Sequence, residues 1–231
     1  NAISYALQFL KNERCIFYIL HTYTPTIYRL DYVIWGPTYS AIPDSKAENA
    51  LIQLENTVVQ LKKQFKNPKH SFEAISAFNI LTDEVSDVCM RKEIDLIVMG
   101  TQGATGAKKV FLGTNTVHVI RKSRVPVLVV PTEYEFQEVK SILFPSDLET
   151  PYKAMELKFL IDIIKMFNPN LYLIHVLEKE NLDENQENNK KILMRHFGVF
   201  NSSFEQVLDK QMPDAIHDFI KQTKTITGRK L

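Results

Sequence analysis

The stretch DLIVMGTQGATGAKKVFLGTNTVHVIRKSRVPVLVV, residues 95–130, decides the fold and carries the main candidate site. Its apolar run ends at Gly100, Gly103 follows, and after nine further residues Gly113 and Thr114 open a helical pattern. A strand, a glycine loop and a helix start in this order bring backbone N–H groups and a helix N-terminus within reach of an anion. The stretch therefore predicts a phosphate-binding loop between a strand and a helix.

Each residue type in this loop has a physical reason to suit a phosphate group. The glycines leave no side chain between the main chain and the ligand. Thr114 can cap the helix or offer its hydroxyl group to phosphate, and the N–H groups of Asn115 and Thr116 are unused within the helix. The spacing differs from that of the P-loop and of the G-x-G-x-x-G fingerprint. Glycines that only form turns are the alternative, but the position between strand and helix favours binding.

Length and composition predict a folded globular protein and exclude some partners. The chain has 231 residues, of which 45% are hydrophobic, enough for one large or two ordinary domains. Lys and Arg number 28 against 27 Asp and Glu, so no net field recruits nucleic acid or an anionic membrane. We therefore expect neither nucleic acid nor membrane as a partner.

The cysteines and apolar runs predict a cytoplasmic location. Cys15 and Cys89 lie in separate apolar segments without metal-binding spacing, so we expect buried, reduced side chains. The longest apolar stretch, residues 125–130, is far shorter than the roughly 20 residues that span a bilayer. No charged and apolar leader sequence is expected either.

Strand and helix patterns alternate along the chain. Apolar periodicity predicts a helix over 51–65, a strand over 72–78 and a helix capped by Thr82, before the strand that ends at Gly100. This alternation is typical of βαβ crossovers and a parallel sheet flanked by helices. Ligands of such sheets bind beyond the carboxyl ends of the strands, where Gly100 lies.

The chain repeats itself once at domain length. His21 and His175 end matching apolar runs, and Ser-Phe-Glu occurs at 71–73 and again at 203–205. We therefore predict two tandem domains, residues 1–132 and 133–231. The polar run at 178–191 in the second domain predicts a solvated, mobile surface segment.

The pattern G-2x-G-9x-G-[S/T], after a strand ending in VMG and before a PVLVV strand, resembles the ATP-binding signature of the universal stress protein family. The duplication resembles the tandem members of that family. The resemblance implies a Rossmann-like α/β fold of the adenine-nucleotide α-hydrolase-like type, ATP with Mg²⁺ as the ligand, and a dimer built around the last strand. It implies that Thr22 lies against adenine, that Met99 and Gly100 lie near ribose and adenine, and that phosphates are surrounded by Gly103, Gly113, Thr114 and Asn115.

Two departures from the family pattern bear on the site. Asp147, after the strand-like residues 141–145, matches an aspartate that meets the nucleotide in the family, but no equivalent precedes the helix at the start of the first repeat. The second repeat reaches Gly228 without a glycine loop. We therefore expect neither repeat to be complete at its outer end, and a degenerate second domain and a merely incomplete one both stay open.

Dedicated catalysis has little support in the sequence. The six histidines have no metal-ligand spacing, and no serine lies in a G-x-S-x-G elbow. We predict an adenine-nucleotide-binding stress-response protein that acts as a binding or regulatory module, as a homodimer or an intramolecular pseudo-dimer. Two alternatives remain: a slow ATP hydrolase of the α-hydrolase-like group, and a dimeric interaction protein that binds no nucleotide.

Overall fold

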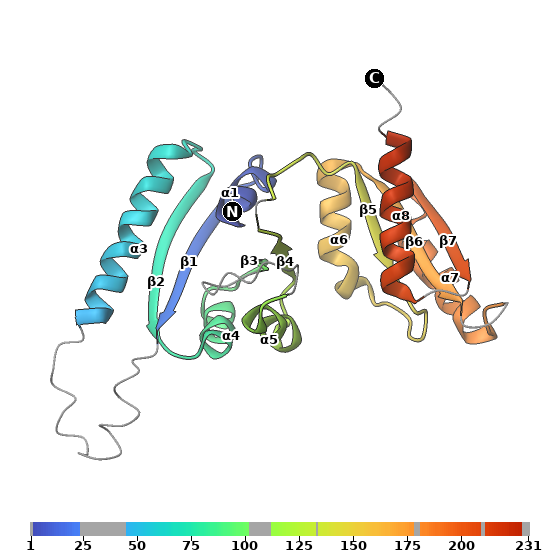
Figure 1. The fold of residues 1–231 in the computed structure, drawn as a ribbon, viewed down its shortest axis with the longest axis horizontal. Coiled ribbons are helices and arrows are strands. Elements are labelled where there is room, and N and C mark those ends of the chain that lie inside the picture. The colour runs from blue at the N-terminus through green and yellow to red at the C-terminus, as the bar shows by residue number, and fades with distance from the viewer. Residues whose placement is uncertain are drawn as a thin grey trace, which may run out of the picture. The chain divides into compact units, whose positions relative to one another are not determined.

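The computed structural model describes residues 2–23, 45–101, 112–132, 134–177, 181–208 and 211–227. The chain divides into two compact units, Asn1–Phe136 and Gln137–Leu231 (Figure 1). The sequence-based boundary between 132 and 133 stays a prediction. No helix in the described ranges is long and apolar enough to cross a membrane.

Unit 1 alternates helices and parallel strands. In chain order its described elements are α1 (Ala2–Phe9), β1 (Cys15–Tyr23), α3 (Ser45–Gln64), β2 (His70–Phe78), α4 (Leu81–Arg91), β3 (Ile97–Gly100), α5 (Thr114–Lys122) and β4 (Val127–Val130). β1 pairs with β2 in parallel from Cys15↔His70 onward, and β3 pairs with β4 in parallel from Ile97↔Val127 onward. The described strands of unit 1 therefore form two small sheets.

The amphipathic pattern predicted for the helix at 51–65 is confirmed in α3. Its apolar stripe is buried at Leu54, Val58 and Leu61, and the helix packs against β2 (Figure 1). The opposite face carries polar and charged side chains, as an amphipathic helix on a sheet requires.

Unit 2 holds one parallel sheet in the order β5-β6-β7. Its described elements are β5 (Ser141–Pro145), α6 (Ala154–Phe167), β6 (Asn170–Leu177), α7 (Glu184–Phe197), β7 (Ser202–Leu208) and α8 (Met212–Thr227). The central strand β6 is apolar throughout and fully covered, with Leu173 and Ile174 both 0% exposed. The parallel α/β class predicted from the alternating pattern is confirmed in both units.

Strand register refines the correspondence between the repeats. Phe72 on β2 pairs with Phe17, whereas Phe204 on β7 pairs with Leu173. If the two Ser-Phe-Glu segments are equivalent, Phe17 matches Leu173, and His21 then matches Leu177 rather than His175. The two histidines end similar apolar runs, but they lie on different rungs of the two ladders.

The prediction of a mobile segment at 178–191 is wrong for its second half. Residues from Glu184 onward form the first turns of α7, preceded by a capping box in which Asp183 accepts from the Gln186 N–H group at 2.8 Å. Asn189 is buried and donates to the Leu148 carbonyl at 2.8 Å. A capping box and acidic residues in the first turn stabilise a helix start even where apolar residues are few.

The start of α4 also differs from the prediction. The helix begins at Leu81 with Ile80 as N-cap, so Thr82 lies inside the first turn, where it is 8% exposed. Asn79 fixes the turn instead, because its Oδ1 accepts from the Ile80 N–H group at 2.8 Å.

The C-terminus of α6 provides a test of backbone strain. Asn168 ends this helix in the left-handed region, with φ of 48°. Glycine adopts this conformation without a Cβ clash, whereas alanine does not. We expect Asn168→Ala to lower the free energy of unfolding by about 1 kcal/mol and Asn168→Gly to leave it unchanged or raise it. Urea unfolding of the two variants checks this, and equal midpoints for Ala and Gly would contradict it.

Candidate functional site

The carboxyl end of β3 and the start of α5 are tied together in unit 1. The Gly113 N–H group donates to the Thr101 carbonyl at 2.7 Å, and the Thr116 hydroxyl donates to the Gly100 carbonyl at 3.0 Å. The Thr101 N–H group in turn donates to the Val130 carbonyl at 3.1 Å. These three bonds hold the two ends of the glycine loop against each other and against β4.

The first turn of α5 has the features of an anion-binding helix start. Gly113 is the N-cap and no side chain caps the helix, while the first helical bond runs from the Val117 N–H group to the Gly113 carbonyl at 3.1 Å. The N–H groups of residues 114–116 therefore take no part in the bonds of the helix itself. Thr114 and Asn115 are exposed there.

Gly113 does not need to be glycine for its backbone angles. Its φ of −59° and ψ of 150° are open to any residue. A glycine at this position therefore points to close approach of a ligand rather than to backbone strain. A side chain at 113 can be added without forcing the backbone out of place, which makes this position suitable for a steric test.

The structure brings most of the sequence-predicted residues together. Gly100, Gly113, Thr114, Asn115 and Thr116 lie at the junction of β3 and α5. Met99 precedes them on β3 and is half-buried. Thr22 lies on the other small sheet, where it pairs with Ala77, and Gly103 lies outside the described residues.

Thr101 is a residue that the sequence analysis missed. It is 8% exposed, and its two backbone groups connect β4 to the helix start. A role carried by backbone groups leaves no side-chain signature in a sequence. The direct succession of Gly100 and Thr101 after an apolar strand was the available signal.

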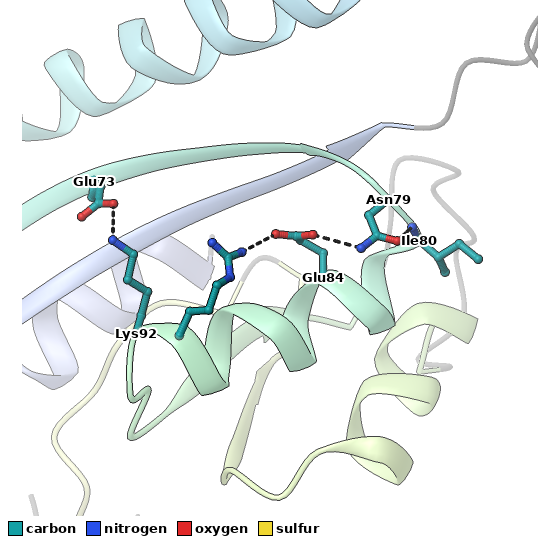
Figure 2. A network of polar contacts seen from close by, with 6 residues as sticks. Glu73, Asn79, Ile80, Glu84 and Lys92 are labelled. Atoms are coloured by element: carbon teal, nitrogen blue, oxygen red, sulfur yellow. Dashed lines mark hydrogen bonds and ion pairs between the residues drawn. The ribbon is translucent and has the colours of Figure 1, made fainter. Parts of the chain in front are cut away.

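A polar network fixes the turn between β2 and α4 (Figure 2). Glu84, 7% exposed, accepts from Arg91 Nη2 at 2.9 Å and from Asn79 Nδ2 at 3.0 Å. Lys92, at the end of α4, donates to Glu73 on β2 at 2.7 Å, and this hydrogen bond raises the pKa of Lys92. The network anchors α4 to β2 and satisfies a buried carboxylate.

The described residues hold no cluster of three or more His, Cys, Asp or Glu side chains that could bind a metal ion. At the corresponding end of β5 in unit 2, Asp147 is exposed and its Oδ1 accepts from the Glu149 N–H group at 3.1 Å. Leu148 between them has a φ of 58°. The proposed contact of Asp147 with a nucleotide stays a prediction.

Thr116 offers a direct test of the tie between α5 and β3. It is 3% exposed, and Thr116→Val removes the hydroxyl group but keeps the shape, so the Gly100 carbonyl loses its partner. We expect a loss of about 1–2 kcal/mol in the free energy of unfolding. Thr116→Ser, which keeps the hydroxyl group, should lose less. Denaturant titration checks both, and a valine variant as stable as wild type would contradict the role of this bond.

Comparison with known proteins agrees with this geometry. Residues 1–131 match the model of the universal stress protein family. Universal stress protein MJ0577 of Methanocaldococcus jannaschii is 31% identical over 88 residues, which cover 38% of this chain and 54% of that protein. Universal stress protein MJ0531 of the same organism is 44% identical over 48 residues, 21% of this chain and 28% of that protein. The chain thus spans about half the length of the first relative and less of the second.

A solved structure extends the likeness to both units. A universal stress protein from Archaeoglobus fulgidus DSM 4304 aligns with 90% of this chain and 73% of its own, with a TM-score of 0.60 and 15% sequence identity. Identity at this level indicates a shared fold.

Proposed function

The chain belongs to the universal stress protein family, and from this premise we propose that unit 1 binds an adenine nucleotide, ATP with Mg²⁺, as a binding or regulatory module of the stress response. The observation that carries the proposal is the junction of β3 and α5. Hydrogen bonds from Gly113 to Thr101 and from Thr116 to Gly100 hold a strand end and an uncapped helix start together. A phosphate chain fits the unused N–H groups of that first turn.

Each proposed contact follows from chemistry at this junction. Phosphate oxygens accept from the amides of residues 114–116, and the helix dipole adds a modest attraction for negative charge. The hydroxyl of Thr114 is exposed and can donate as well, whereas that of Thr116 is already used by Gly100. Thr116 therefore contributes its backbone group to the ligand and its side chain to the fold.

The nucleoside lies beyond the ends of β1 and β3 in this proposal. Met99 and Gly100 contact ribose and adenine, and Thr22 contacts adenine from β1. Gly103 contributes to the phosphate loop. Parallel sheets bind their ligands at the carboxyl ends of strands, and all of these residues belong to that edge or to the loop that leaves it.

Binding rather than chemistry is the proposed activity, with at most slow hydrolysis. Phosphoryl transfer needs a placed metal and a positioned water or base, and no described side chain beside the β3–α5 junction has been assigned to either task. A location in the cytoplasm and a homodimer or pseudo-dimer belong to the same proposal. Sedimentation with and without ATP tests the assembly, and a strictly monomeric chain with no pairing of its units would contradict it.

Thermal unfolding with and without Mg-ATP tests nucleotide binding. A ligand at about 100 times its Kd adds roughly 2.7 kcal/mol to the free energy of unfolding, which moves the midpoint by several degrees for a chain of this size. Gly113→Val should abolish the shift, because its side chain fills the space that a phosphate approaches. The backbone angles at 113 allow valine, so the variant should fold.

Gly113→Ala serves as the matched control, with a smaller obstruction and an intermediate shift. Equilibrium dialysis of labelled ATP should follow the same order of wild type, alanine and valine. If ATP, ADP and AMP all leave the wild-type midpoint unmoved, the proposal is wrong. Release of phosphate over hours at saturating ATP distinguishes slow hydrolysis from binding alone.

A further inference from the structure

An apolar cavity of about 710 Å³ lies between the two small sheets of unit 1. One wall is β1 from Cys15 to Leu20, and another is the segment from Leu96 to Met99 that contains β3. Helices α1 and α4 also line it, with aliphatic side chains such as Ala6 and Val88. Two strand edges and two helices are the surroundings of a central strand in a parallel α/β sheet.

The backbone groups that face this cavity come from alternate residues. The Cys15 N–H group donates to the Lys69 carbonyl beside β2, and the Ile97 N–H group donates to the Pro126 carbonyl beside β4, both at 3.0 Å. Residues along a strand of a parallel ladder direct their backbone groups to its two sides in turn. The groups directed away from β2 and β4 are therefore those of the even-numbered residues, Ile16, Tyr18 and Leu20 in β1 and Val98 in β3. No ladder between described strands uses them.

Unit 2 has a strand in the equivalent place. The Leu171 N–H group of β6 donates to the Asn201 carbonyl next to β7 at 2.9 Å, and the Asn170 N–H group donates to the Lys140 carbonyl next to β5 at 3.0 Å. β6 therefore pairs through both edges. The chain runs through α6, β6, α7 and β7 as it does through α1, β1, α3 and β2, so the edge of β6 taken by β5 corresponds to the open edge of β1.

Burial separates the two strands although their compositions are alike. Five of the eight residues of β6 are buried, but none of the nine residues of β1 is. Ile16 is 60% exposed, and the sequence CIFYILHTY is nearly as apolar as NLYLIHVL. A nearly continuous apolar run is typical of a strand with neighbours on both sides. β1 thus has the composition of a central strand and the exposure of an edge strand.

We propose that this cavity is the docking site of a short parallel β-strand that leads into α1, as β5 leads into α6. The docked strand carries apolar side chains toward both helix layers, like Ile142, Leu143 and Phe144 of β5. A lipid or another apolar molecule would leave the backbone groups of both strand edges without partners, which is costly in a dry site. A strand satisfies them and joins the small sheets into one. This inference does not depend on nucleotide binding.

Two cysteines report on the cavity. Cys15 of β1 and Cys89 of α4 both line it, and both are half-buried. Burial raises the pKa of both thiols, and the nearby carboxylates of Glu13 and Asp95 raise the pKa of Cys15 further. The sequence predicted buried cysteines, and a docked strand would complete their burial.

Labelling of the two thiols tests the proposal. The strand and connection of unit 2, residues 140–153, are copied in front of Ala2 in the full chain. We expect the rate of modification of Cys15 and Cys89 by a maleimide to fall by about tenfold or more, because a covered thiol reacts only when the segment opens. The matched control carries Ile142→Asp and Phe144→Asp in the added copy alone, and it should label at the rate of the unextended chain.

Hydrogen exchange gives a second readout that general stabilisation would not imitate. A docked strand should protect the amides of Ile16, Tyr18 and Leu20 more than those of the alternate residues of β1. Equal labelling rates for the extension and its control, without this alternation, overturn the proposal. Protection by the free 140–147 peptide but not by the folded extended chain overturns the covalent source of the strand. If the extended chain does not fold, the free peptide on the unextended chain decides by the same alternation.

Discussion

Phe197→Ala should lower the free energy of unfolding of unit 2 by about 3–5 kcal/mol. The ring is 0% exposed at the end of α7 and lies 6.0 Å from the ring of Phe144 on β5. It belongs to a core cluster with Leu193 of α7 and Leu173 of β6. Alanine removes apolar surface from this core and leaves a cavity that the sheet and helices around it close only in part.

Hydrogen exchange of the buried β6 amides measures this loss in unit 2 itself. Exchange through global opening of the unit should quicken in proportion to the change in stability. Met155→Ala is the matched control, because Met155 is 88% exposed on α6 and should change stability by less than about 0.5 kcal/mol. A phenylalanine variant no less stable than the Met155 variant would show that α7 contributes no essential core.

Removal of both partners of Glu84 should cost unit 1 about 3–5 kcal/mol. Asn79→Ala together with Arg91→Ala leaves a carboxylate that is 7% exposed without the two donors that hold its oxygens (Figure 2). Each single variant should cost less, because one donor remains and because the Arg91 side chain is itself 58% exposed. The two losses should not add, since both donors serve the same carboxylate.

Glu84→Gln in the double-variant background provides the control. A neutral amide costs less to bury than an unpaired charge, so part of the lost stability should return. Urea unfolding of the four chains measures the cycle. If the double variant matches wild type, water satisfies Glu84 and the network does not anchor α4 to β2.

Periodicity made most elements of this fold predictable. The stripe of α3 and the apolar runs of β1, β3 and β6 state their own secondary structure, since side chains at a fixed period must share a buried face. α7 escaped because its first half is polar. Its start depends on a capping box at Asp183 and on a buried amide, Asn189, whose partner is the Leu148 carbonyl. Local hydrogen bonds and one distant acceptor outweighed composition there.

The sequence by itself determined the parallel α/β class, the resemblance to the universal stress protein family and the glycine positions around Gly100 and Gly113. These features are written in the spacing of side chains, or of their absence, along one strand, loop and helix. Only the tertiary structure decided that Thr101 joins β4 to the start of α5 and that an open strand edge of β1 faces β3 across a cavity. Both depend on backbone groups, which every residue carries alike, so their pairing is fixed by where the chain folds back on itself.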